Sequence, residues 1–251
     1  MMEFDPPIQA THEDRTVLVT GGSGGIGRGL CLAFARAGFW VGVHYFRHHE
    51  AAKDTLAQLS EAGGQGDLYQ ADIRSSSEVQ VMLDSIRTRH GRLDILLCNA
   101  GIASKHLVVN CPEEEWQRII DTNLTGTYRC MTAAAASMMT QGGGSVVVIG
   151  SYAGLQGTHG QGAYAASKAG LMGLVKTAAR EWGPHNIRVN LVCPGWQQTD
   201  MAGDSFPTKE RLRDHVLGRV SNLDDVSRTI CRLALLSDIS GQVWNLDSRI
   251  L

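Results

Sequence analysis

The chain has 251 residues, of which 43% are hydrophobic and 19% charged, and its formal net charge is −2 at pH 7. This balance is typical of a globular protein with a sizeable core and excludes a disordered chain. The nearly neutral charge gives no reason to expect a nucleic-acid or anionic-membrane partner. Residues 1–14 lack the basic start and apolar stretch of a secretory signal, so we expect a flexible N-terminal tail and a cytoplasmic protein.

Short β-rich runs alternate with longer helical ones along the chain. Strands are expected at residues 15–20, 40–45, 67–70, 94–99, 145–150, 188–192 and 242–246. Helices are expected at 25–38, 50–61, 75–89, 113–141 with a break near Asn123, 162–182 and 223–236, and a lid or loop with short helices at 199–218. Strands separated by helices form right-handed βαβ units, which predicts a mostly parallel seven-stranded sheet with helices on both faces. Residues 15–251 are expected to form one domain.

A glycine-rich turn joins the first expected strand to the first expected helix, and it reads TGGSGGIG over residues 20–27. Glycines there permit a tight turn and let backbone N–H groups approach a pyrophosphate, which then lies at the positive end of the helix. Such a turn could also serve only to reverse the chain. Its place in the first strand–turn–helix unit favours a dinucleotide site.

The spacing Gly21-x-x-x-Gly25-x-Gly27 differs from the commoner G-x-G-x-x-G and resembles the short-chain dehydrogenase/reductase family. Further matches follow in the family's order over about residues 15–247: Asp72-Ile73, Asn99-Ala100-Gly101, Asn123, Ser151, Tyr164-x-x-x-Lys168, Pro194-Gly195 and Thr199. The resemblance implies a single-domain Rossmann-type α/β fold. It also implies an NAD(P)-dependent oxidoreductase that transfers hydride between the nicotinamide cofactor and a carbonyl/alcohol substrate.

Four residues match the catalytic tetrad of that family. Tyr164 and Lys168 lie four apart in an expected helix and therefore share one face, and Ser151 comes thirteen residues before Tyr164. A free tyrosine has a pKa of about 10, and we expect the Lys168 ammonium to lower it so that Tyr164 serves as acid/base. Ser151 is expected to hold the substrate oxygen. The resemblance implies that Lys168 also holds the nicotinamide ribose and that Asn123 supports a water beside Lys168.

The residues expected to bind the cofactor come from six segments of the chain. They are Gly21, Ser23, Gly25, Ile26, Gly27, Arg47, Asp72, Ile73, Asn99, Ala100, Gly101, Tyr164, Lys168, Pro194, Gly195 and Thr199. Trp196 and Tyr152 are weaker candidates for contact with substrate.

The end of the second strand usually decides between the two coenzymes, because an acid there binds the ribose 2′-OH and repels a 2′-phosphate. Residues 43–49 contain no acid, and Arg47 is placed where a guanidinium could pair with a 2′-phosphate. The segment also resembles pteridine reductases, NADPH users that read H-Y-x-R there. Against this, Gly24 stands where many NADP-preferring relatives have a basic residue, and Arg47 could simply be solvated. We expect NADP(H) rather than NAD(H).

No metal site is expected. His44, His48 and His49 cluster near the second strand's end, but no cysteine or carboxylate completes a ligand set, which favours a partly solvated loop. The six cysteines form no C-x-x-C pair, which predicts reduced thiols.

The substrate is less constrained than the reaction, because the same fold and tetrad support many chemistries. The main hypothesis is a carbonyl or 3-oxoacyl-type reductase, similar to 3-oxoacyl-[acyl-carrier-protein] reductases, acting on a small carbonyl compound or an acyl thioester. The alternatives are an NAD-dependent sugar or polyol dehydrogenase and a non-catalytic cofactor-sensing protein.

Two segments depart from the family pattern. Residues 245–251 replace the usual V-D-G-G ending, and residues 138–144 lack the basic side chains that acyl-carrier-protein reductases often have there. The first segment can shape the site or a subunit contact, and the second has no charge suited to an acidic carrier. Relatives usually form tetramers, and small residues at 133–136 and 165–170 would let helices approach closely, so we expect a homotetramer.

Overall fold

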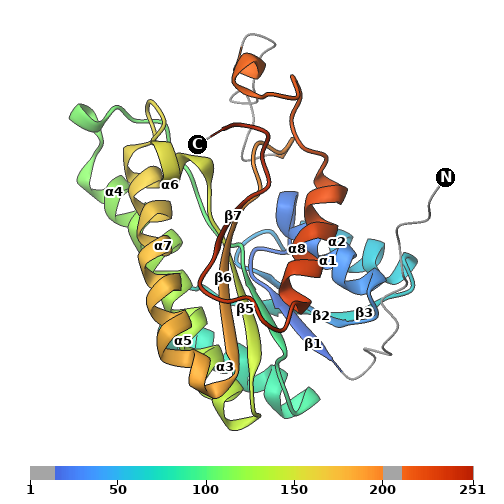
Figure 1. The fold of residues 1–251 in the computed structure, drawn as a ribbon. Coiled ribbons are helices and arrows are strands. Elements are labelled where there is room, and N and C mark those ends of the chain that lie inside the picture. The colour runs from blue at the N-terminus through green and yellow to red at the C-terminus, as the bar shows by residue number, and fades with distance from the viewer. Residues whose placement is uncertain (1–14, 200–210, 251) are drawn as a thin grey trace, which may run out of the picture.

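The computed structural model describes residues 15–199 and 211–250 (Figure 1). The expected N-terminal tail, residues 1–14, and residues 200–210 of the expected lid lie outside these residues. One sheet has the strand order β3-β2-β1-β4-β5-β6-β7, and every neighbouring pair in it is parallel, where the sequence predicted mostly parallel pairing. The strands are β1 (Thr16–Val19), β2 (Trp40–Tyr45), β3 (Gln65–Gln70), β4 (Ile95–Cys98), β5 (Gly144–Ile149), β6 (Ile187–Cys193) and β7 (Val243–Asn245).

Helices cover both faces of the sheet. They are α1 (Gly25–Arg36), α2 (His49–Glu61), α3 (Ser76–His90), α4 (Glu113–Ile120), α5 (Thr127–Thr140), α6 (Tyr152–Gln156), α7 (Gly162–Trp182) and α8 (Leu223–Leu235). Short 3₁₀ turns are η1 (Val108–Asn110), η3 (Gly183–His185) and η5 (Arg211–Asp214). The expected break near Asn123 is a π-helical segment, η2 (Asp121–Gly126), between α4 and α5.

The two faces of the sheet carry two separate apolar clusters. Helices α3, α5 and α7 pack on one face, and α1, α2 and α8 pack on the other (Figure 1). Because side chains alternate along a strand, Leu18 points to the first cluster while Val17 and Val19 point to the second. All four residues of β1 are buried, which explains why three of the four, Val17, Leu18 and Val19, are apolar.

The local sequence accounts for the helix ends. Ser75 caps α3 by accepting a hydrogen bond from the Glu78 N–H, and Gly91 ends that helix in the left-handed region at φ 74°. Asn222 caps α8 in the same way, accepting from the N–H groups of Asp224 and Asp225.

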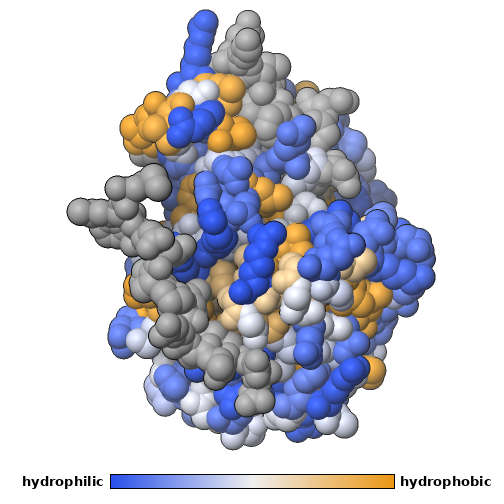
Figure 2. All heavy atoms as spheres, turned by 90° about the vertical axis from the view of Figure 1, so that its right-hand side faces the viewer, coloured by the Kyte–Doolittle hydropathy of each residue, from blue (hydrophilic) through white to orange (hydrophobic). Residues whose placement is uncertain are grey.

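Hydrophilic residues cover most of the face at the right of Figure 1, with apolar groups scattered among them, as Figure 2 shows.

The strand order reverses between β1 and β4, because the chain moves outward from β1 to β3 and then returns to the other side of β1. The loops that follow β1 and β4 therefore turn to opposite faces and leave a crevice at the carboxyl ends of the strands, the usual ligand site of such sheets. In the part of the chain that the structure describes, no helix combines the length and apolar character needed to cross a membrane. All six cysteines are free thiols.

Candidate active site

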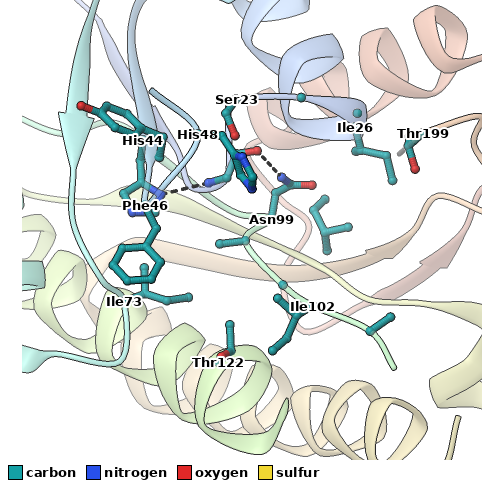
Figure 3. A pocket seen from close by; sticks show the side chains of 18 of the residues that line it. Ser23, Ile26, His44, Phe46, His48, Ile73, Asn99, Ile102, Thr122 and Thr199 are labelled. Carbon is teal, nitrogen blue, oxygen red and sulfur yellow. Dashed lines mark hydrogen bonds between the residues drawn. The ribbon is translucent and has the colours of Figure 1, made fainter. Parts of the chain in front are cut away.

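A cavity of about 650 Å³ opens at the carboxyl ends of the strands (Figure 3). Most residues singled out from the sequence line it: Gly21, Ser23, Gly25, Ile26, Arg47, Asp72, Ile73, Asn99, Ala100, Gly101, Ser151, Tyr164, Lys168, Pro194, Gly195 and Thr199. Gly27 and Asn123 are not among its lining residues, and neither are Tyr152 and Trp196. The cavity also involves residues that the sequence did not single out as binding groups, among them Phe46, Arg74 and Arg118.

The glycine loop is shaped by contacts with the neighbouring strand. A Cβ on Gly27 would lie 2.0 Å from the Gly21 carbonyl oxygen and 2.7 Å from Asn99 Nδ2, so position 27 admits only glycine. Gly21 and Gly25 have positive φ angles of 66° and 54°. At Gly24, the residue that precedes α1, no side chain caps the helix, and the first turn contains no acid. The helix N-terminus therefore offers its N–H groups to a pyrophosphate, as a dinucleotide requires.

Thr20 and Asn99 tie this loop to the end of β4. The Thr20 hydroxyl donates to the Leu97 carbonyl at 3.1 Å and accepts from the Asn99 and Ala100 N–H groups at 2.9 and 3.1 Å. The Asn99 side-chain amide donates to the Thr20 carbonyl at 3.0 Å. It also donates to the Gly21 carbonyl at 3.0 Å (Figure 3). These hydrogen bonds hold the backbone of the glycine loop in place without a ligand.

His44 is a further support that the sequence did not reveal. Its Nδ1 accepts from the Gly21 N–H at 3.0 Å (Figure 3), and its Nε2 donates to the Ala71 carbonyl at 3.0 Å. Burial lowers the pKa of His44 to about 4, so the ring is neutral near pH 7. The expectation of a partly solvated histidine loop is wrong for His44, which is buried in β2, and correct for the exposed His48. His49 is also exposed but is the first residue of α2. The signal available in the sequence was the position of His44, the next-to-last residue of the strand that follows the glycine loop and first helix.

Ser151, Tyr164 and Lys168 meet on the opposite side of the cavity. Ser151 follows β5 and caps α6, with its hydroxyl accepting from the Ala153 N–H at 3.2 Å. Tyr164 and Lys168 share one face of α7, and the Lys168 Nζ lies 5.8 Å from the Tyr164 ring centroid. Lys168 is 5% exposed, and its Nζ donates to the Ile149 carbonyl at 2.7 Å.

The charge states of this group differ from the expectation. Burial raises the pKa of Tyr164, and an interaction with the Ser151 hydroxyl opposes this rise, whereas Lys168 was expected to lower the pKa. The reason is that Tyr164 lies in a poorly solvated site and the Lys168 ammonium is directed to a backbone carbonyl. Burial also lowers the pKa of Lys168 itself, to about 8. In this state Tyr164 holds its proton at neutral pH.

Asn123 lies behind the cavity and is fully buried. Its Oδ1 accepts from the Ile102 N–H at 2.8 Å, and its Nδ2 donates to the Ile102 carbonyl at 2.9 Å and to the Ser167 hydroxyl at 3.0 Å. Asn123 thereby joins the loop after β4 to α7 next to Lys168. Its expected support of a water beside Lys168 stays a prediction.

Two arginines flank Phe46 at the other end of the cavity. The Arg47 guanidinium lies 4.9 Å from the centre of the Phe46 ring and that of Arg74 lies 5.7 Å from it. Arg74 holds Asp72 through a bidentate pair, at 2.6 Å for the Nη2–Oδ2 contact, and this pairing lowers the pKa of Asp72. Among the described residues Arg47 has no such carboxylate partner, so its charge is available to a ligand.

Comparison with known proteins gives consistent matches. The family model described as short chain dehydrogenase matches residues 15–210. A 3-oxoacyl-[acyl-carrier-protein] reductase of Staphylococcus aureus is 36% identical over 222 residues, which is 88% of this chain and 90% of that protein. One from Synechocystis is 36% identical, over 93% of this chain and 95% of that protein. The crystal structure of a short-chain type dehydrogenase/reductase from Mycobacterium marinum has a TM-score of 0.89 and 33% identity, and the match covers 94% of this chain and 95% of that one.

Proposed function

From the premise that this chain belongs to the short-chain dehydrogenase family, and is an NAD(P)-dependent oxidoreductase acting on a C=O/CH–OH pair, we propose that it reduces 3-oxoacyl thioesters with NADPH. The observation that carries the substrate assignment is the 36% identity to 3-oxoacyl-[acyl-carrier-protein] reductases over about nine-tenths of both chains. The cavity with Ser151, Tyr164 and Lys168 at one end supports the reaction type.

In this proposal Tyr164 donates a proton to the substrate oxygen. Burial keeps its pKa above the ordinary value, so the hydroxyl is protonated and ready to donate at neutral pH. The Ser151 hydroxyl donates a hydrogen bond to the same oxygen and holds it near Tyr164. The nicotinamide coenzyme supplies the hydride when bound. The glycine loop, Asn99 and Lys168 are the groups proposed to bind it.

The choice of NADPH rests on the arginines at the end of β2 and β3. Arg47 lines the cavity, is exposed and forms no ion pair with a carboxylate among the described residues. The nearby Asp72, whose pKa the Arg47 charge also helps to lower, is already paired with Arg74. A 2′-phosphate there would meet a guanidinium that forms no ion pair within the described part of the chain, and a carboxylate that is already paired with Arg74. Arginine binds phosphate through paired N–H groups, so Arg47 is the residue we propose for this contact.

Replacing Arg47 with alanine should lower kcat/KM for NADPH by roughly 10–100-fold and leave kcat/KM for NADH nearly unchanged, since a hydrogen bond to a charged group contributes about 1.5–3 kcal/mol. The measurement is steady-state kinetics with both coenzymes on one substrate. Arg87→Ala, which removes an exposed arginine paired with Asp84 on α3, is the matched control and should change neither value. Equal losses with both coenzymes, or a wild-type preference for NADH, would count against NADPH.

The substrate assignment is tested by a panel followed through the absorbance of the reduced nicotinamide. We expect NADPH oxidation with 3-oxoacyl thioesters, on coenzyme A and on acyl carrier protein, to exceed that with simple ketones. Both carriers are needed because residues 138–144, at the end of α5, contain no charge to attract an acidic carrier protein. Turnover confined to sugars or polyols with NAD⁺, or coenzyme binding without any turnover, would contradict the proposal.

We also propose a homotetramer in the cytoplasm. Helices α5 and α7 leave small residues exposed, including Ala136, Ala166 and Gly170, beside the half-exposed Tyr128. Such a surface lets helices of two copies approach closely. The six free thiols fit a reducing compartment.

A further inference from the structure

The segment after β7 inserts a carboxylate beneath the cavity. The Asp247 side chain is 1% exposed, and its carboxyl group lies against Gly195, where a Cβ would come within 2.9 Å of the Asp247 Cγ. Gly195 itself has a φ of 75° and lines the cavity. Any larger residue at position 195 would collide with this carboxylate. The glycine of the Pro194-Gly195 turn is therefore required by Asp247 as well as by its own backbone angle.

Asp247 is held by hydrogen-bond donors and by a facing histidine. Its carboxylate accepts from the Arg249 Nε at 2.7 Å, from the Arg249 Nη2 and from the Arg249 backbone N–H at 3.1 Å. His215 Nδ1 lies 3.1 Å from the second carboxylate oxygen, and the Val216 N–H donates to the Ser248 carbonyl at 3.1 Å. A buried carboxylate with this many partners is held in one geometry.

Arg249 extends this cluster to the catalytic serine. Its guanidinium carbon lies 3.8 Å from the centre of the Tyr152 ring, and the Arg249 side chain is 12% exposed. Tyr152 is the residue directly after Ser151 and the first residue of α6. The Ser151 hydroxyl accepts from the N–H of Ala153, in the first turn of the same helix. The position of α6 therefore controls where the Ser151 hydroxyl lies.

We infer that Asp247 and Arg249 form a strut between Gly195 and Tyr152, and that Arg249 is a positioning residue for Ser151. The strut joins the carboxyl ends of β5, β6 and β7, which are neighbours in the sheet but far apart in the sequence. A glycine at position 249, as in the usual V-D-G-G ending, could make neither the ion pair nor the ring contact. The inference rests on the proposed function, in which Ser151 holds the substrate oxygen.

Two variants break the strut at different points. Arg249→Ala removes the guanidinium, and Tyr152→Leu removes the ring while leaving both charges of the Asp247–Arg249 pair in place. Each is expected to lower kcat by about tenfold, because small displacements of a positioned group are costly, and to leave the coenzyme dissociation constant unchanged. Arg249→Lys keeps the cation without the planar guanidinium and should fall between wild type and Arg249→Ala. If Arg249→Ala does not fold, Arg249→Lys takes its place in the test.

The pH profile of alcohol oxidation separates positioning from general damage. Oxidation requires ionised Tyr164, and the Ser151 hydroxyl lowers the pKa of Tyr164, so a displaced Ser151 moves the apparent pKa of kcat/KM upward. The other titratable groups facing Tyr164 are Lys168 of α7 and Cys193 of β6. Arg249→Ala removes a charge that acts on Cys193, whereas Tyr152→Leu leaves the charges around both groups in place. An upward shift with Tyr152→Leu cannot come from a lost charge.

Double variants complete the test. Ser151→Ala should itself lower kcat and shift the profile, and Arg249→Ala in that background should add no more than about twofold. Arg89→Ala, which breaks the exposed Arg89–Asp67 pair at the opposite edge of the sheet, should match wild type. If Ser151→Ala has no effect, the proposed function fails. Two outcomes would overturn the strut while Ser151→Ala lowers kcat. In the first, Arg249→Ala and Tyr152→Leu keep the wild-type kcat and pH profile. In the second, the loss of kcat caused by a strut variant multiplies with the loss caused by Ser151→Ala.

Discussion

Tyr164→Phe is expected to lower kcat by about 10²–10⁴, the usual contribution of a positioned acid or base. Only the ionisable oxygen is lost, because phenylalanine fills the same buried space on α7. The neighbouring Lys168 keeps its bond to the Ile149 carbonyl, so coenzyme affinity should stay close to that of wild type. Single-turnover kinetics and coenzyme titration by fluorescence measure the two quantities separately.

Tyr69→Phe is the matched control for this variant. Tyr69 lies on β3, at the far edge of the sheet, and its ring packs edge-on against Trp40. Loss of its hydroxyl should leave turnover unchanged. If Tyr164→Phe kept more than about a tenth of wild-type turnover, Tyr164 would not be the acid/base, since the loss would be far below the usual range.

Gly27→Ala should raise the dissociation constant for the coenzyme by about 100-fold or more. An increase of this size corresponds to the loss of several charge-assisted hydrogen bonds. The added Cβ would stand 2.0 Å from the Gly21 carbonyl oxygen, a backbone atom that cannot rotate away. The turn would have to open, and its N–H groups would then no longer converge on one phosphate. Isothermal titration with NADPH measures the effect directly.

Gly24→Ala controls for the loss of a loop glycine. Its φ of −176° is open to any residue, and a Cβ there meets no protein atom within 4 Å. The apo form of this variant should therefore melt at the wild-type temperature, whereas apo Gly27→Ala should melt lower. Wild-type NADPH affinity in Gly27→Ala would show that the loop geometry is not what binds the coenzyme.

Much of the fold was accessible from the sequence, because its signals are local. Strands buried on both faces read as unbroken apolar runs, as in β1 and β4, and the expected strand limits differ from the observed ones by at most two residues. The spacing of Tyr164 and Lys168 placed both on one face of a helix without any tertiary information. The five-residue helix α6 was not expected, since a helix so short depends on its cap and its packing against α7.

The supports of the site were not accessible, because each joins segments far apart in the chain. These supports depend on which loops become neighbours in the fold. They are the hydrogen bond from the Gly21 N–H to His44, the hydrogen bond from the Ile102 N–H to Asn123, and the contact of the Arg249 guanidinium with the Tyr152 ring. The same holds for the pKa of Tyr164. Its sign is decided by burial, which the lysine four residues away does not reveal.

The position of Asn123 depends on the exact number of residues in the π-helical segment η2. A π-turn holds an extra residue relative to an α-helix, and such insertions are frequent at functional sites. Each residue in an α-helix turns the chain by about 100°, so losing one from residues 121–126 would swing Asn123 away from Ile102 or turn the buried stripe of α5 out of the core. Over evolutionary time this segment should accept replacements at its partly buried positions far more readily than insertions or deletions.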